Sequence, residues 1–496
     1  MRSASKLHLP MWKHQTEGAE RCINAIDGGF GLFFEVGTGK SRTAITAMRH
    51  LFARNGRVMR TLILSPKITL INWNREIVEY SKIHPLDITV LNKAGKKRAQ
   101  MAIEKATAID GALTKGHIFI TNYEALQMSD LYEMLRRWKP ELIICDEAHR
   151  IKNPKSKRAK ALFPIAFEAA YRYALTGTPI LNTPMDIFNI FKFIDKGDTF
   201  GLNWITFRSK WFEDENAEFA GKPNYFPKWV PRPETYAVFN RLIKHKSMRA
   251  LKSECLDLPP FVREELYIEL SAEQRRLYKE MEREYITFIR DRKNSGELRA
   301  VTAQIALTKS LRLQQILAGF VKDETGVIHK LDENPRLEAL RDFLEDYGKD
   351  HKIIVWTIFE PTYDDIKKVC EDLGLPCVEL TGRTPDKDRQ ANMDAFNNDP
   401  KIRVMVANQA AGGIGVNFIA SDLAIYYTKG IFAEQDVQSE ARNYRGGSEI
   451  HQKVTRVDII SQGTYDEVVN RGLRGKKSTA EILLDWSPDE FTDSKE

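Results

Sequence analysis

Cysteine is scarce in this sequence: the 496 residues include five, and no two of them form a C-x-x-C pair or join a histidine cluster. Zinc centres and disulfide frameworks need such groupings, so we expect scattered thiols in a reducing compartment. The five are Cys22, Cys145, Cys255, Cys370 and Cys377. Residues 1–10 lack the apolar core of a signal peptide, and no apolar run is long enough to span a membrane. We therefore expect a soluble protein of the cytoplasm that makes no contact with a membrane.

A large excess of either charge is also absent. With 75 Lys and Arg against 68 Asp and Glu, the formal net charge is +7, which permits binding to nucleic acid without requiring it. Hydrophobic residues make up 42% and charged residues 29%, as in an ordinary folded protein. Since one core cannot serve so long a chain, we expect about two to four domains.

Apolar runs that alternate with helical patterns organise both halves of the chain. In the first half the expected strands are residues 30–34, 61–65, 87–91, 117–121, 141–145 and 172–176, with helices at 41–52 and 70–80. From residue 352 the alternation resumes, with strands at 353–357, 377–380, 402–408, 423–427 and 454–460. Continuous apolar strands separated by helices predict parallel sheets that are buried on both faces. The predicted fold class is therefore α/β, with two parallel-sheet lobes, residues 1–250 and 251–496, and a cleft between them.

Two segments interrupt this alternation. Residues of about 200–235 are rich in Trp, Phe, Pro and Lys without a clear period, and we interpret them as a small insertion in the first lobe. Its aromatic side chains either stack on bases or, as we favour, form a small core. Residues 249–260 end in Pro-Pro and predict a linker. A helical segment of about 265–330, with helices at 271–292 and 301–316, opens the second lobe.

A glycine-containing turn follows the first expected strand. Residues 33–41 read FFEVGTGKS, so Gly37 and Gly39 lie between an apolar strand and a helix. Glycines let backbone N–H groups approach an anion, and the helix N-terminus adds partial positive charge. Lys40 adds a full positive charge, and the Ser41 hydroxyl can bind Mg²⁺. The turn predicts a nucleoside triphosphate site, although a glycine-rich turn with an incidental lysine would read the same way.

Two acids follow the expected strand at residues 141–145, and in a parallel sheet ligands bind at the carboxyl ends of the strands. Asp146 offers hard oxygen ligands to Mg²⁺, and Glu147 can polarise an attacking water. Adjacent acids could also simply solvate a loop, but the GTGKS turn upstream favours the catalytic interpretation. The next strand ends in LTGTP at residues 175–179. Its two hydroxyls lie where a sensor between the nucleotide site and the polymer site would be useful, and a tight turn would explain Gly177 and Pro179 equally well.

These motifs resemble those of superfamily-two helicase-like ATPases. Gln15, the GTGKS turn, SPK at 65–67, TNYE at 121–124, DEAH at 146–149 and LTGTP at 175–179 occur in that family's order. The runs NWNRE at 72–76, HRIKN at 149–153 and TPILN at 178–182 are similar to the Swi/Snf-type branch of DNA translocases. In the second half, LTG at 380–382, GGIGVN at 412–417 and QxxxRxxRxG from Gln438 resemble the later motifs. The resemblance covers about residues 7–484.

The sequence departs from this family at a few positions. Phe34 stands where an acid is usual, and residues 428–434 lack the usual Asp and Trp-Asn-Pro. Tyr444 and Ser448 replace the usual His and Gln. These departures affect which subfamily the chain resembles and how ATP hydrolysis would be coupled to movement. They do not affect the ATP chemistry, because the residues that would bind and hydrolyse ATP are present.

Two arginines follow in the last of these motifs. Arg442 and Arg445 are three residues apart, so a helix would place them on one face, from which both could reach one target. Guanidinium groups donated across a cleft stabilise charge on a transferring phosphoryl group. A surface helix with two solvated arginines is the alternative, which the other motifs disfavour.

The resemblance implies two RecA-like lobes and residues that bind ATP and Mg²⁺. Those implied at ATP are Gln15 at the adenine, then Gly37, Thr38, Gly39, Lys40 and Ser41, with Gly413 and Gly415 in the second lobe. Ser41 and Asp146 would hold the metal, and the implied catalytic residues are Lys40, Asp146, Glu147, Arg442 and Arg445. The implied nucleic-acid contacts are Lys67, Asn122, Tyr123, Lys152, Lys155 and Arg383.

The resemblance also implies an activity, namely a DNA-stimulated ATPase that moves along double-stranded DNA, expected to act as a monomer. A strand-separating helicase or the motor of a restriction system shares the same two lobes and stays open. A non-hydrolysing nucleic-acid clamp also stays open, although the complete set of catalytic residues disfavours it. The lack of recognisable chromatin-reading appendages favours a compact bacterial or viral protein.

Overall fold

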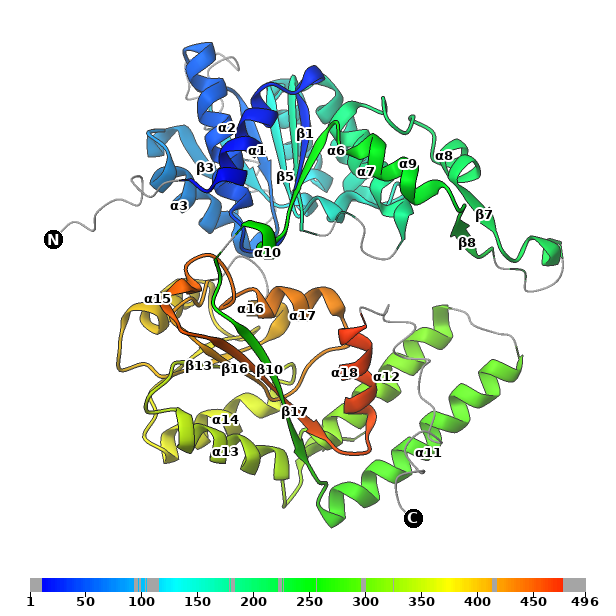
Figure 1. Cartoon of the computed structure of the whole chain (residues 1–496), viewed down its shortest axis with the longest axis vertical. Helices are drawn as coiled ribbons and strands as arrows, with labels where there is room; N and C mark the ends of the chain where they lie inside the picture. The colour runs from blue at the N-terminus through cyan, green and yellow to red at the C-terminus, as the bar shows by residue number, and fades with distance from the viewer. Residues whose placement is uncertain are drawn as a thin grey trace. The chain divides into compact units, whose positions relative to one another are not determined.

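The chain folds into two compact units, Met1–Asp257 and Leu258–Glu496, and Figure 1 shows that each contains a central sheet with helices around it. The structure is a computed structural model that describes residues 11–92, 97, 100–102, 104, 116–177, 179, 183–221, 225, 227–255, 257–295, 300–323, 325–412 and 417–475. None of the helices in these ranges is long and apolar enough to cross a lipid bilayer.

The first unit is built on a seven-stranded parallel sheet with the strand order β3-β4-β2-β5-β6-β1-β9. Its strands are β1 (Gly29–Phe34), β2 (Thr61–Leu64), β3 (Ile88–Val90), β4 (Ile118–Thr121), β5 (Leu142–Asp146), β6 (Tyr171–Leu175) and β9 (Ser247–Ala250). All but β9 coincide with the predicted apolar runs. Strand β9 reads Ser-Met-Arg-Ala and pairs only with β1 at the edge of the sheet, so it needs no apolar run; its last two residues overlap the start of the predicted linker.

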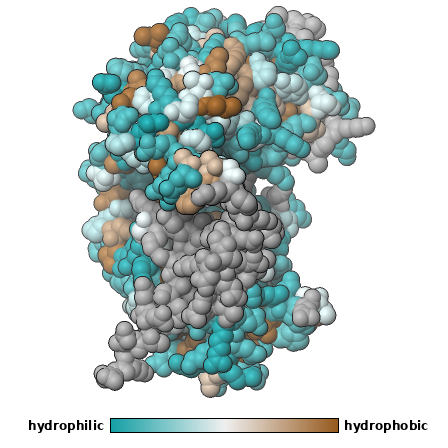
Figure 2. All heavy atoms as spheres, turned by 90° about the vertical axis from the view of Figure 1, so that its right-hand side faces the viewer, coloured by the Kyte–Doolittle hydropathy of each residue, from teal (hydrophilic) through white to brown (hydrophobic). Residues whose placement is uncertain are grey.

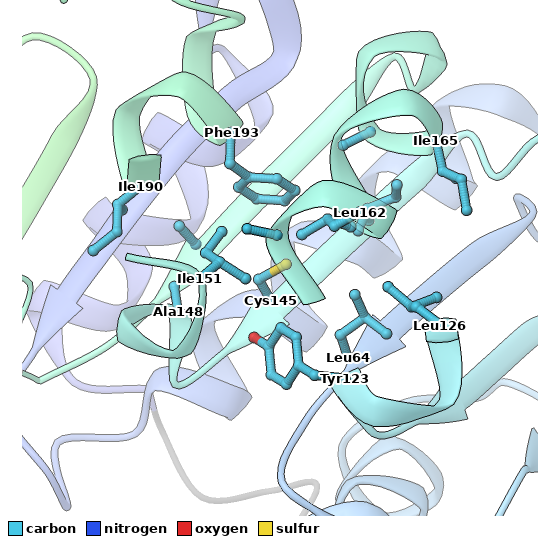
Figure 3. Close-up of a cluster of buried hydrophobic side chains, with 14 of the residues drawn as sticks. Leu64, Tyr123, Leu126, Cys145, Ala148, Ile151, Leu162, Ile165, Ile190 and Phe193 are labelled. Carbon is cyan, nitrogen blue, oxygen red and sulfur yellow. The ribbon is translucent and has the colours of Figure 1, made fainter. Parts of the chain in front are cut away.

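Helices cover both faces of this sheet. They are α1 (Lys13–Ile23), α2 (Lys40–Asn55), α3 (Leu70–Tyr80), α5 (Ser129–Trp138), α6 (Lys157–Glu168) and α7 (Ile187–Asp195), with the short α10 (Lys252–Cys255) after β9. Alternate residues of β5 enter two different cores, Ile144 with α2 and α3, and Cys145 with α5, α6 and α7. Figure 3 shows part of the second core, with Leu64, Tyr123, Cys145 and Leu162 among the labelled side chains. Burial on both faces leaves the carboxyl edge of the sheet as the place for polar side chains.

The predicted insertion consists of α8 (Trp204–Trp211), an antiparallel pair β7 (Phe212–Asp214) and β8 (Trp229–Pro231), and α9 (Thr235–Ile243). Phe207 and Phe239 stack with ring centroids 5.8 Å apart, and Phe207 lies 4.7 Å from Phe188 of α7. These buried rings belong to the same core cluster as α5, α6 and α7. The aromatic side chains therefore pack as we favoured, but they extend the core of the first unit and do not form a separate one.

The second unit is built on a six-stranded parallel sheet with the order β10-β17-β16-β13-β15-β14. Its strands are β10 (Phe261–Ile268), β13 (Ile353–Trp356), β14 (Cys377–Leu380), β15 (Val404–Ala407), β16 (Leu423–Tyr426) and β17 (Val454–Ser461), and a hairpin joins β11 (Phe320–Lys322) to β12 (Ile328–Lys330). Strand β10 is the one sheet strand here that the sequence analysis missed. It pairs with β17 along all of its length, from Phe261↔Val454 to Ile268↔Ser461.

The helices of the second unit include the predicted pair before the sheet, α11 (Ala272–Ser295) and α12 (Ala300–Leu317). The others are α13 (Pro335–Tyr347), α14 (Pro361–Asp372), α15 (Asp386–Asn398), α16 (Gln409–Gly412), α17 (Ala433–Glu440) and α18 (Tyr465–Arg474). Tyr278 of α11 and Leu313 of α12 form a core with Val469 of α18. The predicted fold class is confirmed, because each unit is an α/β layer structure on a parallel sheet.

Candidate functional site: a phosphate loop and two acids at the carboxyl edge of the sheet

The turn between β1 and α2 has a backbone that only glycine adopts readily. Gly37 has a φ of 91° and Gly39 a φ of 84°. A Cβ atom on Gly39 would lie 1.9 Å from Nε2 of Gln15, so a side chain would displace the Gln15 amide as well as strain the backbone. Gly39 is the N-cap of α2, and the helix begins at Lys40. The first turn of the helix, with the positive end of its dipole, therefore lies at this loop, as an anion site requires.

The residues before β1 hold this loop from behind. His14 Nε2 lies 2.8 Å from the carbonyl oxygen of Thr38, and Gln15 Nε2 donates to the same oxygen at 3.4 Å. The Trp12 N–H donates to Gln15 Oε1 at 3.1 Å. The ring of His14 packs edge-on against Phe34, 5.4 Å between centroids. His14 is thus a supporting residue that sequence reasoning missed, and only its place beside Gln15 could have indicated it.

Phe34 and Glu35 explain the departure of this loop from the family pattern. Phe34 is fully buried in the core beneath α2, where an acid would be costly. Glu35 accepts a hydrogen bond from the Lys252 N–H at 2.9 Å, and its own N–H donates to the carbonyl oxygen of Ala250 at 2.9 Å. Glu35 therefore ties the loop to the residues that follow β9. The Lys40 ammonium donates to the carbonyl oxygen of Phe34 at 3.0 Å, folded across the loop.

Strand β5 delivers Asp146 to the same edge of the sheet as this loop. In the sheet order β5-β6-β1, Asp146 is in register with Leu175, and Leu175 with Leu32 of β1. The Asp146 carboxylate accepts hydrogen bonds from Ser65 Oγ at 2.7 Å and from Trp73 Nε1 at 2.9 Å. Burial raises the pKa of Asp146, the charge of Glu147 adds to the rise, and Lys40 opposes it.

These observations test whether Mg²⁺ would fit. A buried carboxylate beside a second acid is costly unless a positive charge compensates for it. Two neutral donors, Ser65 and Trp73, orient Asp146, and Lys40 approaches closely enough to influence its pKa. Carboxylate and hydroxyl oxygens are the ligands that Mg²⁺ prefers, and Ser41 supplies a hydroxyl in the first turn of α2. The donor set therefore fits the ion.

Glu147 follows Asp146 in a backbone conformation that is rare for non-glycine residues, with a φ of 49°. Its Oε2 lies 3.4 Å from His149 Nδ1, and the same nitrogen lies 3.3 Å from the Thr176 hydroxyl at the end of β6. His149 thus lies between the Glu147 carboxylate and the end of the next strand. Thr178, the second hydroxyl of that motif, lies outside the described residues.

The arginines of the second unit do not lie on a helix, and that prediction is wrong. Helix α17 ends at Glu440, and the next residues form turns. The Arg442 carbonyl oxygen accepts from the N–H of Phe418, a residue of another segment, at 2.9 Å. Gly447, with a φ of 103°, closes the segment. Arg442 is buried and Arg445 is partly exposed, both in one short segment of turns.

Comparison with known families identifies the chain. The SNF2-related domain family matches residues 14–318, more than half of the sequence, and the family "Helicase conserved C-terminal domain" matches residues 335–447. The chain belongs to the SNF2-related family. This confirms the predicted resemblance to Swi/Snf-type helicase-like ATPases.

Individual relatives of this SNF2-related protein are distant in sequence. An "Uncharacterized ATP-dependent helicase" of Mycoplasma pneumoniae is 26% identical over 468 residues, which are 92% of this chain and 40% of the relative. The human "SWI/SNF-related matrix-associated actin-dependent regulator of chromatin subfamily A member 1" is 24% identical over 469 residues, which are 92% of this chain and 42% of the relative. The chain therefore spans about two fifths of these curated relatives. The solved structure titled "Sulfolobus solfataricus SWI2/SNF2 ATPase core in complex with dsDNA" is 23% identical with a TM-score of 0.42, covering 97% of this chain and 96% of that one.

The residues expected to contact nucleic acid differ in their surroundings. Tyr123 is fully buried, and its hydroxyl donates to the backbone carbonyl oxygen of Asp146 at 2.6 Å, so its side chain supports the acidic strand end and does not reach a polymer. Asn122 is also buried and donates to Glu124 at 2.7 Å. Lys67 and Lys155 are exposed.

The two remaining nucleic-acid candidates, Lys152 and Arg383, form ion pairs, and the two glycines expected at ATP in the second unit cannot be placed. Lys152 pairs with Asp186 at 3.1 Å. Arg383, in the second unit, forms ion pairs with Asp364 at 2.6 Å and Glu379 at 2.8 Å, so a phosphate would have to compete with two carboxylates for it. Gly413 and Gly415 lie outside the described residues.

Proposed function

We propose that this protein is a DNA-stimulated ATPase that moves along double-stranded DNA and remodels DNA or protein–DNA complexes. The observation that carries the proposal is that a helix N-terminus preceded by two glycines lies at the same sheet edge as the buried Asp146 and the partly buried Glu147. A loop of this kind can bind the phosphates of a nucleotide through its backbone N–H groups, and two adjacent acids can promote hydrolysis of the terminal phosphate. Membership of the SNF2-related family supports both steps.

The proposed roles in the first unit follow from the chemistry of each group. Backbone N–H groups at Gly37, Thr38 and Gly39, with the Lys40 ammonium, bind the phosphates of ATP. Ser41 and Asp146 would hold Mg²⁺, which supplies charge neutralisation on the phosphate oxygens. Glu147 accepts the proton of the attacking water. Gln15 approaches the adenine while its amide supports Thr38.

The second unit is proposed to complete the reaction. Arg442 and Arg445 place guanidinium groups on the γ-phosphate when the units close around ATP, stabilising charge that grows in the transition state. The glycines Gly413 and Gly415 approach the nucleotide in the same state. Repeated closing and opening then alternates the grip of the two units on the polymer, so that each hydrolysis advances the protein.

The proposed polymer is double-stranded DNA, contacted mainly through its phosphates by Lys67, Lys152, Lys155 and Arg383, with the Asn122 segment nearby. Such contacts are largely independent of sequence and weaken with salt. The choice of duplex DNA is supported by the human relative, which is named as a regulator of chromatin.

The proposal is tested by ATP turnover in the presence of double-stranded DNA, single-stranded DNA and RNA, with Lys40→Ala as the inactive control. We expect duplex DNA to stimulate turnover most, and a third strand bound to a duplex to be displaced while a short duplex stays paired. Separation of the short duplex would instead identify a strand-separating helicase. DNA binding without turnover would identify a clamp. Turnover that Lys40→Ala leaves intact would refute the assignment.

The donors to Asp146 give a further prediction for this site. Trp73→Phe removes the Nε1–H that bonds Asp146 but keeps an aromatic ring in the core. Loss of a donor to a carboxylate raises its pKa and weakens its hold on a cation, so we expect a loss of apparent Mg²⁺ affinity of about 10- to 100-fold. Titration of ATP turnover with Mg²⁺ measures this, and Trp138→Phe, a buried tryptophan of the other core, is the matched control. Equal Mg²⁺ dependence of the two variants would contradict the role.

A further inference from the structure

The two arginines proposed to act on ATP lie in a segment whose position is set by contacts with other elements. Residues 441–447 are turns, so the arginines cannot rely on the regular ladder of a helix to hold them. Such a segment keeps one geometry only when tertiary contacts fix it at several points. Two of those points involve strand β10, the first strand of the second unit.

The first contact is between aromatic rings. Phe261, the first residue of β10, packs against Tyr444 in a tilted arrangement with 4.5 Å between centroids and 34° between planes. Tyr444 lies between Arg442 and Arg445 in the sequence, and both rings are partly buried. The position of Phe261 is itself fixed, because Phe261 pairs with Val454 in the sheet and the Val454 N–H donates to the carbonyl oxygen of Pro260 at 3.0 Å. The contact between the two rings therefore ties the position of the arginine segment to that of strand β10.

The second contact is an ion pair at the end of α17. Arg263 of β10 bonds to Glu440, the last residue of the helix, and its guanidinium carbon lies 5.7 Å from the centre of the Phe261 ring. Glu440 also accepts from Arg456 of β17 at 3.1 Å. The same Arg456 bonds Asp436 one turn earlier in α17, at 2.7 and 3.0 Å. Two neighbouring strands thus hold the end of the helix just before Arg442.

We propose that Phe261, supported by Arg263, is a positioning residue for Arg442 and Arg445. The inference rests on the proposed ATP hydrolysis. Phe261 touches neither phosphate nor nucleic acid in this proposal; it keeps the Tyr444 segment in the geometry in which both guanidinium groups reach one phosphoryl group.

The test combines a direct and a functional measurement on Phe261→Leu, which keeps an apolar side chain but removes the ring, and on Phe261→Ala. Hydrogen exchange of the peptide that contains residues 441–447 should become at least about tenfold faster. At saturating ATP and DNA, kcat should fall about 10- to 100-fold, as for a misplaced catalytic group, while the affinity for ATP stays within about twofold. Phe261→Tyr, which restores the ring, should return both values to within about twofold of the native protein.

The control is Tyr267→Ala, an aromatic residue of the same strand whose hydroxyl bonds Glu265 and whose ring is half exposed. It should change neither exchange of the segment nor kcat. Exchange in Phe261→Leu equal to that of Tyr267→Ala would overturn the proposal, and so would an unchanged kcat. Hydrogen exchange needs no turnover, so failure of the proposed function would be seen separately, as a native protein that does not hydrolyse ATP.

Discussion

Glu147→Gln is expected to lower DNA-stimulated ATP turnover by about two to four orders of magnitude, with ATP affinity within about twofold of the native protein. The amide has almost the shape of the carboxylate but cannot accept a proton from the attacking water. The contacts that bind the phosphates, which we assign to the loop at residues 37–41, are not touched by this change. The effect should therefore fall on kcat and not on binding.

The surroundings of Glu147 make this prediction specific. Its backbone is held in a left-handed conformation directly after Asp146, and its carboxylate lies 3.4 Å from His149. Glutamine fits the same space, so loss of turnover would reflect loss of the base and not of the fold. Steady-state turnover with saturating duplex DNA and titration with a fluorescent nucleotide measure the two quantities.

Glu168→Gln is the matched control for this experiment. Glu168 ends α6 and pairs loosely with Lys139 at 3.9 Å, both side chains being well exposed, so its replacement should leave turnover unchanged. An equally small effect of Glu147→Gln would remove Glu147 from the mechanism. A large loss of ATP affinity in Glu147→Gln would show that the acid acts in binding instead.

The sequence predicts the interior strands of this fold well because those strands must be apolar on both sides. Strand β5 alternates between two cores, so every side chain before Asp146 is buried and the run Leu-Ile-Ile-Cys is visible without structural information. Strand β10 lies at a sheet edge and reads Phe-Val-Arg-Glu-Glu-Leu-Tyr-Ile, with several side chains exposed. An edge strand of this kind has no apolar run, and only its pairing with β17 reveals it.

The candidate site also contains some residues whose roles the sequence predicts and others whose roles it does not. The loop and the acids are predictable because each follows an apolar strand and has a chemical signature in its own residues. The roles of the groups that orient them are not: Trp73 and Ser65 lie in the recognised runs NWNRE and SPK, but they bond Asp146 from 73 and 81 residues away, and nothing local links them to that carboxylate. The prediction of a helix at the two arginines fails for a related reason, since α17 ends at Glu440 and the segment after it is bonded by Phe418, which comes from another part of the chain. Support by distant partners is what a single sequence does not display.

The second large effect is expected at Arg445. Arg445→Ala should lower kcat by about 10³-fold or more, the size of effect that an arginine finger has on phosphoryl transfer, with ATP affinity nearly unchanged. Arg442 is buried in its own unit, whereas Arg445 is partly exposed in the same segment, so Arg445 is better placed to extend toward a ligand. Charge on the phosphoryl oxygens grows in the transition state, so the loss should appear in kcat.

Arg445→Lys separates charge from geometry. Lysine keeps the positive charge but lacks the planar fork that bonds two oxygens, so we expect it to recover only a small part of the lost turnover. Arg341→Ala, on the exposed side of α13 where Arg341 pairs with Asp372 at 2.6 Å, is the control and should have native turnover. Weaker ATP binding with an unchanged kcat at saturation would contradict the finger role, because it would mean that Arg445 stabilises the bound ATP and its transition state equally. A fall in kcat that lysine fully restores would assign the effect to charge alone, so Arg445 would act without the two-pronged contact.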